Sequence, residues 1–250
     1  MATIPQFTYP PETYRQHAEN RSRLWTLWMP LLSVFVVLGV ALISREASFK
    51  WMFSERTGVV EFIHALFPVL TAIIALGLLR YDSIRSDPFL VGWCIVMAIG
   101  GIYLGGEEAS WGQHYIGWTT PEFWANVNDQ QETNLHNTSF LLDQYPRTIL
   151  KVGIFFSALI LPWFLLNKPH LVMRRFDFVY PGLTLVPMAL LILFTQFYNQ
   201  AQDWVDWKIV RLVRGGEFQE LYIVWFLLLY ALMLRRRAKQ ADAVLNGEQP

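Results

Sequence analysis

Three carboxylates and two imidazoles lie within 30 residues of one another in the middle of the chain, among many asparagine and glutamine side chains. They are Glu107, Glu108, His114, Glu132 and His136. Carboxylates and imidazoles are common protein ligands of zinc and of non-haem iron. A bound ion of this kind makes hydroxide from water near neutral pH, or activates dioxygen if it is iron. Without a metal, paired carboxylates beside a histidine still support general acid–base chemistry.

Two pairs of ligand-type residues have spacings that bring side chains together on a helix. Glu61 and His64 are three residues apart, and Glu132 and His136 are four apart, so each pair would share one helical face. Helix-borne Glu-x-x-His pairs with further glutamates are the ligand set of di-metal carboxylate bundles. The sequence predicts Glu61, Glu107, His114, Glu132 and His136 as metal ligands, with Glu107 and Glu108 as the catalytic carboxylates.

Several other chemistries lack their sequence patterns. Ser110 is not set in the Gly-x-Ser-x-Gly that positions a nucleophilic serine, and no glycine-rich phosphate loop occurs. Cys94 is the single cysteine, which excludes an intrachain disulfide and a multi-cysteine metal site. The formal net charge is zero, so no general field attracts nucleic acid. A divalent zinc or iron ion is therefore the expected cofactor, and nucleic acid is not an expected partner.

Long apolar runs make up most of the chain. Residues are 54% hydrophobic and 16% charged, against about 25% charged in soluble domains. A bilayer core about 30 Å thick needs about 20 apolar residues in a helix, and barrel strands would alternate in polarity, which these runs do not. The sequence predicts one all-α membrane domain, a bundle of about six spans: Leu24–Ile43, Gly58–Leu79, Pro88–Gly106, Thr148–Leu166, Phe178–Tyr198 and Glu220–Leu234.

The distribution of lysine and arginine predicts the orientation of these spans. Segments on the same side as the N-terminus hold 12 basic residues, and those on the other side hold 8. Because cytoplasmic loops are enriched in lysine and arginine, both termini are expected in the cytoplasm. Residues 1–23 and 235–250 are then cytoplasmic tails, and the chain from Ala238 is expected to be disordered. The acidic outer loop 107–147 is expected to lie at the membrane surface and to fold back over the mouth of the bundle.

This topology brings distant ionisable groups to one end of the bundle. Nine of them share that membrane depth, because the second and sixth spans start there and the third ends there: Glu61, His64, Glu107, Glu108, His114, Glu132, His136, Glu217 and Glu220. Adjacent carboxylates at the end of a membrane segment are costly unless a cation or a shared proton compensates them. Glu217 and Glu220 are more simply explained by the preference of helix N-termini for negative charge.

Local patterns predict three further features. Gly101 and Gly105 form a small-xxx-small pattern that would let the third span pack closely on a neighbour. Pro121 after Thr120 is typical of a helix start with the threonine as cap. Residues 201–214 mix tryptophans with charges, which is typical of an interfacial helix.

Two motifs resemble those of a bacterial family of multi-span membrane proteins for which no activity is established. They are Gly-Glu-Glu-Ala-Ser-Trp-Gly-Gln at 106–113 and Asn-Asp-Gln-Gln-Glu-Thr-Asn-Leu-His-Asn at 128–137. The resemblance covers about 35 residues, with looser similarity around Glu61 and Glu220. It implies an inner-membrane protein with several spans, and site residues at Glu61, Glu107, Glu108, Glu132 and His136. The family has arginine where this chain has His114, and His64 is peculiar to this chain.

The leading hypothesis is a metal-dependent membrane enzyme, of hydrolase or oxidase type, that acts on a lipid or lipid-linked substrate at the periplasmic face. The alternative is a non-catalytic accessory or scaffold subunit of a larger membrane complex. In that case Glu107 and Glu108 would pair with basic residues of a protein partner, or with Arg147 and Lys151. A transporter is disfavoured, because a pathway needs polar groups through the full depth of the spans.

Overall fold

The computed structural model describes residues 24–44, 51–54, 58–128, 130–204 and 215–247, and this part of the chain is helical without strands. The α-helices are α2 (Met29–Ile43), α4 (Val59–Leu78), α5 (Asp82–Arg85), α6 (Pro88–Glu108), α7 (Gln113–Ile116), α8 (Glu122–Val127), α9 (Phe140–Phe155), α10 (Leu161–Asn167), α11 (Val186–Trp204) and α12 (Gly215–Leu245). Two π-helical turns, Leu24–Trp28 and Phe156–Ile160, lead into α2 and join α9 to α10. Short 3₁₀ turns lie at Ser110–Gly112, His136–Thr138, Pro169–Leu171, Arg174–Phe176 and Leu183–Leu185.

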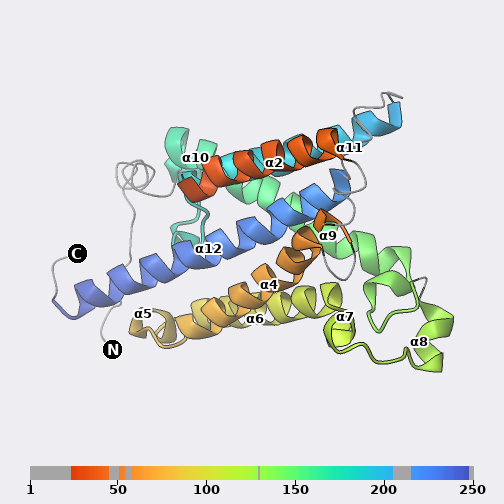
Figure 1. Ribbon diagram of the computed structural model, residues 1–250. Coiled ribbons are helices and arrows are strands. Elements are labelled where there is room, and N and C mark those ends of the chain that lie inside the picture. The colour runs from red at the N-terminus through yellow and green to blue at the C-terminus, as the bar shows by residue number, and fades with distance from the viewer. Residues whose placement is uncertain (1–23, 45–50, 55–57, 129, 205–214, 248–250) are drawn as a thin grey trace.

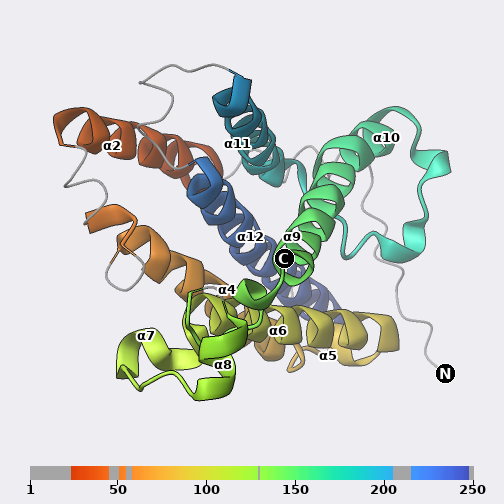
Figure 2. The same cartoon turned by 90° about the vertical axis from the view of Figure 1, so that its right-hand side faces the viewer.

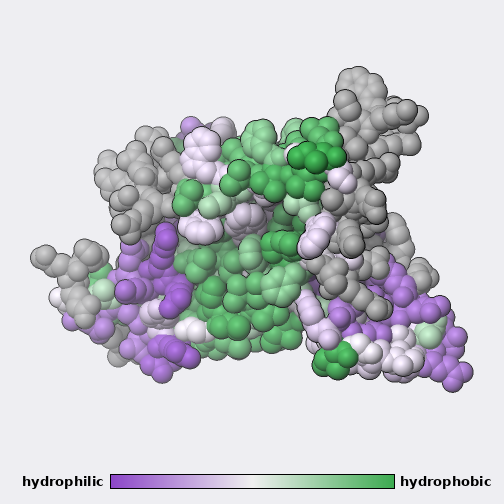
Figure 3. Space-filling model, viewed as in Figure 1, coloured by the Kyte–Doolittle hydropathy of each residue, from purple (hydrophilic) through white to green (hydrophobic). Residues whose placement is uncertain are grey.

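Among the described residues, five helical segments, against the six spans predicted, are long and apolar enough to cross a membrane: Val59–Leu78, Pro88–Glu108, Gln144–Asn167, Leu183–Ala201 and Gly216–Leu245. The first expected span is helical from Leu24 to Ile43, but its apolar helix Leu24–Val40 is shorter than these five. Figure 3 shows a broad apolar band between two polar ends. The prediction of an all-α, multi-pass membrane bundle is confirmed.

Helix α12 lies at the centre of the bundle. It packs against α4 and α11, and α4 packs along α6 (Figure 2). The long helices run alternately in opposite directions, so the first turns of α4, α9 and α12 lie at the same end as the last turn of α6 (Figure 1). The polar loop, defined as residues 109–139 between α6 and α9, also lies at this end. The predicted gathering of polar elements at one end is therefore present.

Close contact between α4 and α6 depends on two glycines. A Cβ at Gly101 would lie 2.5 Å from the Pro68 carbonyl oxygen, and one at Gly105 would lie 2.8 Å from the Ala65 carbonyl oxygen. Neither separation is possible for real atoms, so only glycine allows these backbones to approach. The predicted small-residue packing is confirmed, with α4 as the neighbour.

Three predicted span boundaries are wrong. The fourth span begins at Gln144 rather than Thr148, in a helix that starts at Phe140, where the Ser139 side chain caps it by accepting a hydrogen bond from the Leu142 N–H. The fifth begins at the 3₁₀ turn Leu183–Leu185, after a Pro-Gly pair that interrupts the helix. The sixth extends beyond both predicted ends, as α12.

The prediction of disorder from Ala238 is also wrong, since α12 continues to Leu245. Ala238 is fully buried, and the Asp242 carboxylate accepts hydrogen bonds of 2.9 Å from the backbone N–H groups of Asp82 and Ser83 at the start of α5. Tertiary contacts therefore stabilise a segment whose composition is polar. The predicted interfacial helix 201–214 is described only to Trp204, where α11 ends, and its remainder lies outside the described residues.

Candidate functional site

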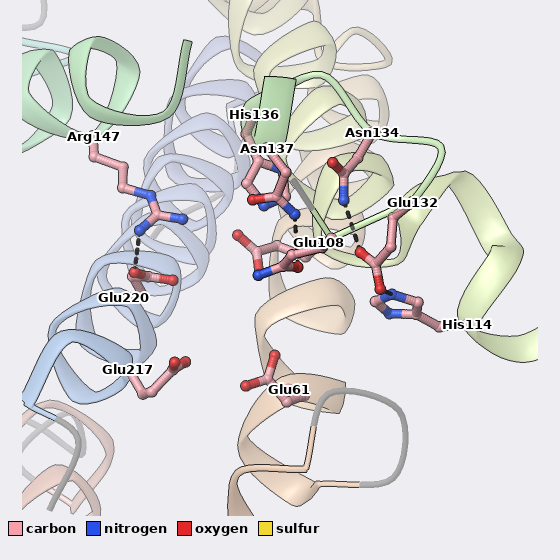
Figure 4. A pocket seen from close by; sticks show the side chains of 11 residues that line it. Glu61, Glu108, His114, Glu132, Asn134, His136, Asn137, Arg147, Glu217 and Glu220 are labelled. Carbon is pink, nitrogen blue, oxygen red and sulfur yellow. Dashed lines mark hydrogen bonds and ion pairs between the residues drawn. The ribbon is translucent and has the colours of Figure 1, made fainter. Parts of the chain in front are cut away.

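A cavity of about 270 Å³ opens at the polar end of the bundle. Its walls come from α4, α6, α9, α12 and the polar loop, and Figure 4 shows their side chains turned toward one another. The lining residues are Glu61, Glu108, His114, Gln130, Glu132, Asn134, His136, Asn137, Arg147, Glu217 and Glu220. Of the predicted site residues, Glu107 alone does not line this cavity.

Glu107 instead fastens the polar loop to the end of α6. Its carboxylate, 2% exposed, accepts hydrogen bonds from Trp111 Nε1 (2.7 Å) and from the backbone N–H groups of Leu135 (2.7 Å) and His136 (2.8 Å). His136 Nδ1 lies 3.3 Å from the same carboxylate. These contacts involve both oxygens of the carboxylate. The structure therefore differs from the prediction that Glu107 is a metal ligand and a catalytic carboxylate.

Ser110, Trp111 and Gly112 reverse the chain directly after α6, with φ of 45°, 54° and 105°. This left-handed region is uncommon for residues other than glycine. The turn brings the Trp111 ring against Gly106, where a Cβ would lie 2.9 Å from the ring. It also returns Ser110 into the loop, where it is fully buried.

Glu132 is the centre of a second hydrogen-bond network. It accepts from Ser110 Oγ (2.7 Å), His114 Nε2 (2.7 Å) and Asn134 Nδ2 (3.0 Å). His114 Nε2 also lies 3.0 Å from Ser110 Oγ. A serine nucleophile needs a histidine that contacts the serine through one nitrogen and the acid through the other. Here the same nitrogen faces both groups, so the network positions the loop and does not activate Ser110.

These hydrogen bonds predict a pH dependence. Burial raises the pKa of the Glu132 carboxyl, but the hydrogen bonds from His114, Ser110 and Asn134 outweigh it and hold that pKa below its usual 4.5. A carboxyl whose pKa is depressed on folding stabilises the fold above its unfolded pKa and loses that contribution as the pH falls through the folded value. We expect the polar loop to loosen as the pH falls below about 4.5. Tryptophan fluorescence against pH measures this, and the Glu132→Gln variant should have a weaker transition. An unchanged transition in that variant would contradict the assignment.

Amide side chains fold the rest of the loop. Asn128 Oδ1 accepts from the backbone N–H groups of Gln130 (3.0 Å) and Glu132 (3.1 Å). Gln113 Nε2 donates to Thr120 Oγ1 (2.7 Å), which in turn bonds a loop carbonyl. Thr120 is therefore not the cap that was predicted, since the N-cap of α8 is Pro121. Gln113 and Asn128 thus bond backbone groups of the loop, whereas Gln130, Asn134 and Asn137 line the cavity.

A buried histidine lies beside three of the glutamates that line the cavity. His64 is 1% exposed, and its Nε2 lies 3.1 Å from the backbone carbonyl oxygen of Glu217. A carbonyl oxygen only accepts hydrogen bonds, so Nε2 carries the proton, and in the neutral ring Nδ1 carries the lone pair. This Nδ1 has no hydrogen-bond partner among the described residues. Buried polar atoms without partners are rare and cost about 1–3 kcal/mol each.

Three carboxylates from three helices surround this Nδ1. It lies 4.0 Å from Glu61 Oε2, 4.0 Å from Glu108 Oε2 and 3.9 Å from Glu217 Oε2. The ligand atoms of Glu61, His64 and Glu108 all lie within 4.8 Å of one another. Zinc bonds to nitrogen and oxygen are about 2.0–2.2 Å, so a tetrahedral ion holds its ligands roughly 3.4 Å apart. Small rotations of the glutamates would close this difference. The donor set fits a divalent cation.

In the part of the chain that the structure describes, one arginine and no lysine line the cavity. Arg147 on α9 reaches across to Glu220 on α12 and donates to its carboxylate through Nη1 (Figure 4). One turn later, Lys151 Nζ donates to the side-chain oxygens of Gln196 (3.1 Å) and Gln219 (3.4 Å). The expected pairing of these basic residues with Glu107 and Glu108 is therefore not what the structure has.

The predicted residues thus divide into two groups. Glu61 and Glu108 belong to the acidic cluster, defined as His64 with the carboxylates of Glu61, Glu108 and Glu217 around it, whereas Glu107, His114, Glu132 and His136 take part in loop hydrogen bonds. The cluster adds His64 and Glu217, which were not among the predicted ligands. The Glu61-x-x-His64 spacing was a sequence signal that could have identified His64. The position of Glu217 at the start of the last span was a signal that could have identified Glu217.

A comparison with models of known protein families gave no match, and neither did comparisons with curated proteins and with solved structures. The resemblance of the two loop motifs to a bacterial membrane family therefore stays a prediction. The geometry of the cavity is what indicates a function for this protein.

Proposed function

We propose that the protein is a metal-dependent membrane enzyme that acts on a lipid or lipid-linked substrate. The observation that carries this proposal is the buried Nδ1 of His64, which lies among three carboxylates and has no hydrogen-bond partner in the described part of the chain. The proposed ligands are Glu61, His64, Glu108 and Glu217. Three carboxylates cluster in a half-buried site at a cost that a divalent cation would remove. This set replaces the sequence prediction based on Glu107, His114, Glu132 and His136.

One nitrogen and three oxygen ligands suit zinc or iron. Such an ion supplies Lewis-acid chemistry, because it polarises a substrate oxygen or lowers the pKa of a water molecule. Zinc would indicate a hydrolase, and iron an oxidase. The metal found in the purified protein distinguishes these two reaction types.

His136 is the proposed proton acceptor. It lines the cavity, and the Glu107 carboxylate lies 3.3 Å from its Nδ1. A carboxylate on Nδ1 holds the proton there and leaves Nε2 as the basic nitrogen. Glu107 is then a positioning residue that acts through His136, and Glu108 is a ligand.

The position of the cavity supports a lipid substrate. Its lining residues come from the polar loop and from the ends of the long helices beside it, and Figure 3 shows the apolar band of the surface giving way to polar residues at the ends of the bundle, where lipid headgroups would lie. The Gln130 and Asn137 side chains at its rim offer hydrogen bonds to a headgroup. The bias of basic residues supports cytoplasmic termini and an extracytoplasmic position for this end, which is the periplasmic side if the protein lies in a bacterial inner membrane as the resemblance implies.

Metal analysis of matched histidine variants tests the proposal. Protein purified in detergent and loaded with Zn²⁺ or Fe²⁺ should retain about one equivalent, measured by mass spectrometry of the metal. His64→Gln should lose it, because the only nitrogen ligand is gone. The control His114→Gln removes a histidine of the same cavity that bonds Glu132, and it should retain the metal. A wild-type protein without stoichiometric metal, or loss in His114→Gln alone, would overturn the proposal.

The alternative, a scaffold subunit, is less well supported. In that hypothesis Glu107 is part of a docking surface, but its carboxylate is buried and accepts hydrogen bonds from the protein's own loop. Glu108 faces the cavity and not the outer surface.

A further inference from the structure

Glu220 belongs to two arrangements at once. It is paired with Arg147, and it also forms a possible ligand group with His64 and Glu217, whose ligand atoms all lie within 4.8 Å of one another. Glu217 and Glu220 are three residues apart at the start of α12, so their side chains share one face. Glu217 is also 3.9 Å from His64 Nδ1. Glu220 is therefore the carboxylate next to the proposed ligands.

A guanidinium and a metal ion compete for the same carboxylate. Arg147 neutralises Glu220 and holds its carboxylate toward α9, which leaves the proposed ion with Glu61, His64, Glu108 and Glu217. If the guanidinium turned to another anion, Glu220 could move to the ion as a further oxygen ligand. A side-chain rotation suffices for this move, because a carboxylate oxygen of Glu220 already lies within 4.8 Å of the ligand atoms of His64 and Glu217.

The charge pattern of the cavity defines what could displace Glu220. Of the residues that the structure describes, five carboxylates line the cavity, and Arg147 is the only lysine or arginine in its lining. An anionic group that enters is repelled by the carboxylates and attracted by this one guanidinium, whose planar donors suit phosphate and carboxylate groups. The Arg147 side chain is 30% exposed, so such a group can reach it.

We propose that Glu220 alternates between Arg147 and the metal ion, and that an anionic lipid headgroup causes the exchange by pairing with Arg147. The inference rests on the proposed function and adds to it the substrate class and the residue that recognises it. Binding of the headgroup and of the metal are then coupled. Because coupling is reciprocal, each ligand tightens the binding of the other by the same factor, typically about 5- to 150-fold.

Metal affinity in four variants tests the exchange. Arg147→Gln should tighten Zn²⁺ or Co²⁺ binding by about tenfold, because Glu220 is released to the ion. In the Arg147→Gln/Glu220→Gln double variant this gain should disappear relative to Glu220→Gln alone. Lys151→Gln is the matched control, since it removes a cation one turn away on the same helix without releasing Glu220. A gain that persists in the Glu220→Gln background, or that Lys151→Gln reproduces, would show a general charge effect and overturn the proposal.

The trigger is tested in nanodiscs of defined composition. Metal should bind the wild-type protein more tightly in phosphatidylglycerol than in phosphatidylcholine, with no such difference in Arg147→Gln or Glu220→Gln. These variants also correct for metal adsorbed by the anionic lipid. Sodium sulfate against sodium chloride in phosphatidylcholine discs tests a free anion, and an equal effect of sulfate would overturn the lipid as the source. Equal affinity in all conditions would overturn the trigger.

The two proposals fail separately. A wild-type protein that binds no metal removes the proposed function. A wild-type protein that binds metal with an affinity that none of the variants changes removes only the exchange.

Discussion

Replacing Glu107 with alanine is expected to detach the polar loop from the bundle while the metal-binding residues stay in place. The carboxylate accepts hydrogen bonds from Trp111 Nε1 and from the N–H groups of Leu135 and His136. All three donors would lose their acceptor, and each buried donor left unpaired costs about 1–3 kcal/mol. Hydrogen exchange at Leu135 and His136 measures the effect, and we expect their protection to fall at least tenfold, since about 1.4 kcal/mol corresponds to that factor.

Glu108→Ala is the matched control, because it removes the neighbouring carboxylate of the same helix turn. It should leave exchange at Leu135 and His136 unchanged and abolish stoichiometric metal. Glu107→Ala should have the opposite pattern. Loss of metal in Glu107→Ala with a fully protected loop would contradict the division of roles between the two glutamates.

Gly101→Val is expected to prevent α4 and α6 from packing. The new Cβ would lie 2.5 Å from the Pro68 carbonyl oxygen and 3.0 Å from Ala72 Cβ, and no side-chain movement can relieve a clash with backbone. Overpacking in a well-packed core commonly costs about 1–3 kcal/mol, and a backbone clash costs more. Thermal unfolding in detergent should show a large fall in Tm. Because α4 carries Glu61 and His64, bound metal should fall as well.

Gly100→Val tests the same substitution at the adjacent position. Nothing lies within 4 Å of a Cβ at Gly100, so this variant should keep nearly the wild-type Tm and its metal. If both variants unfolded alike, the loss would reflect valine in the helix and not the contact with α4.

The two adjacent glutamates show where prediction from sequence stops. Successive residues on an α-helix point about 100° apart, so Glu107 and Glu108 face different neighbours although they share one depth in the membrane. Glu108 faces α4 and α12, and Glu107 faces the returning loop. Which of the two belongs to the acidic cluster depends on how α6 is rotated in the bundle, and that rotation is set by the glycine contacts with α4.

The polar loop shows a related limit. Its carboxylates and imidazoles are the right types for a metal site, but Glu132 and His114 satisfy each other. A pattern of residue types cannot distinguish a ligand from a partner in a hydrogen bond, because the same lone pairs serve both. His64 Nδ1 has no hydrogen-bond partner among the described residues, and this can be recognised only when the positions of its neighbours are known.

The sequence by itself determined the helical membrane bundle, most of its spans, the close contact at Gly101 and Gly105, and the end at which the ionisable groups gather. These follow from the length and polarity of segments, because a bilayer requires apolar helices of a certain length. Only the tertiary structure decided which carboxylates surround His64, that Glu107 fastens the loop, and that α12 continues past Ala238. Those outcomes depend on side-chain direction and on contacts between segments far apart in the chain, which length and polarity do not specify.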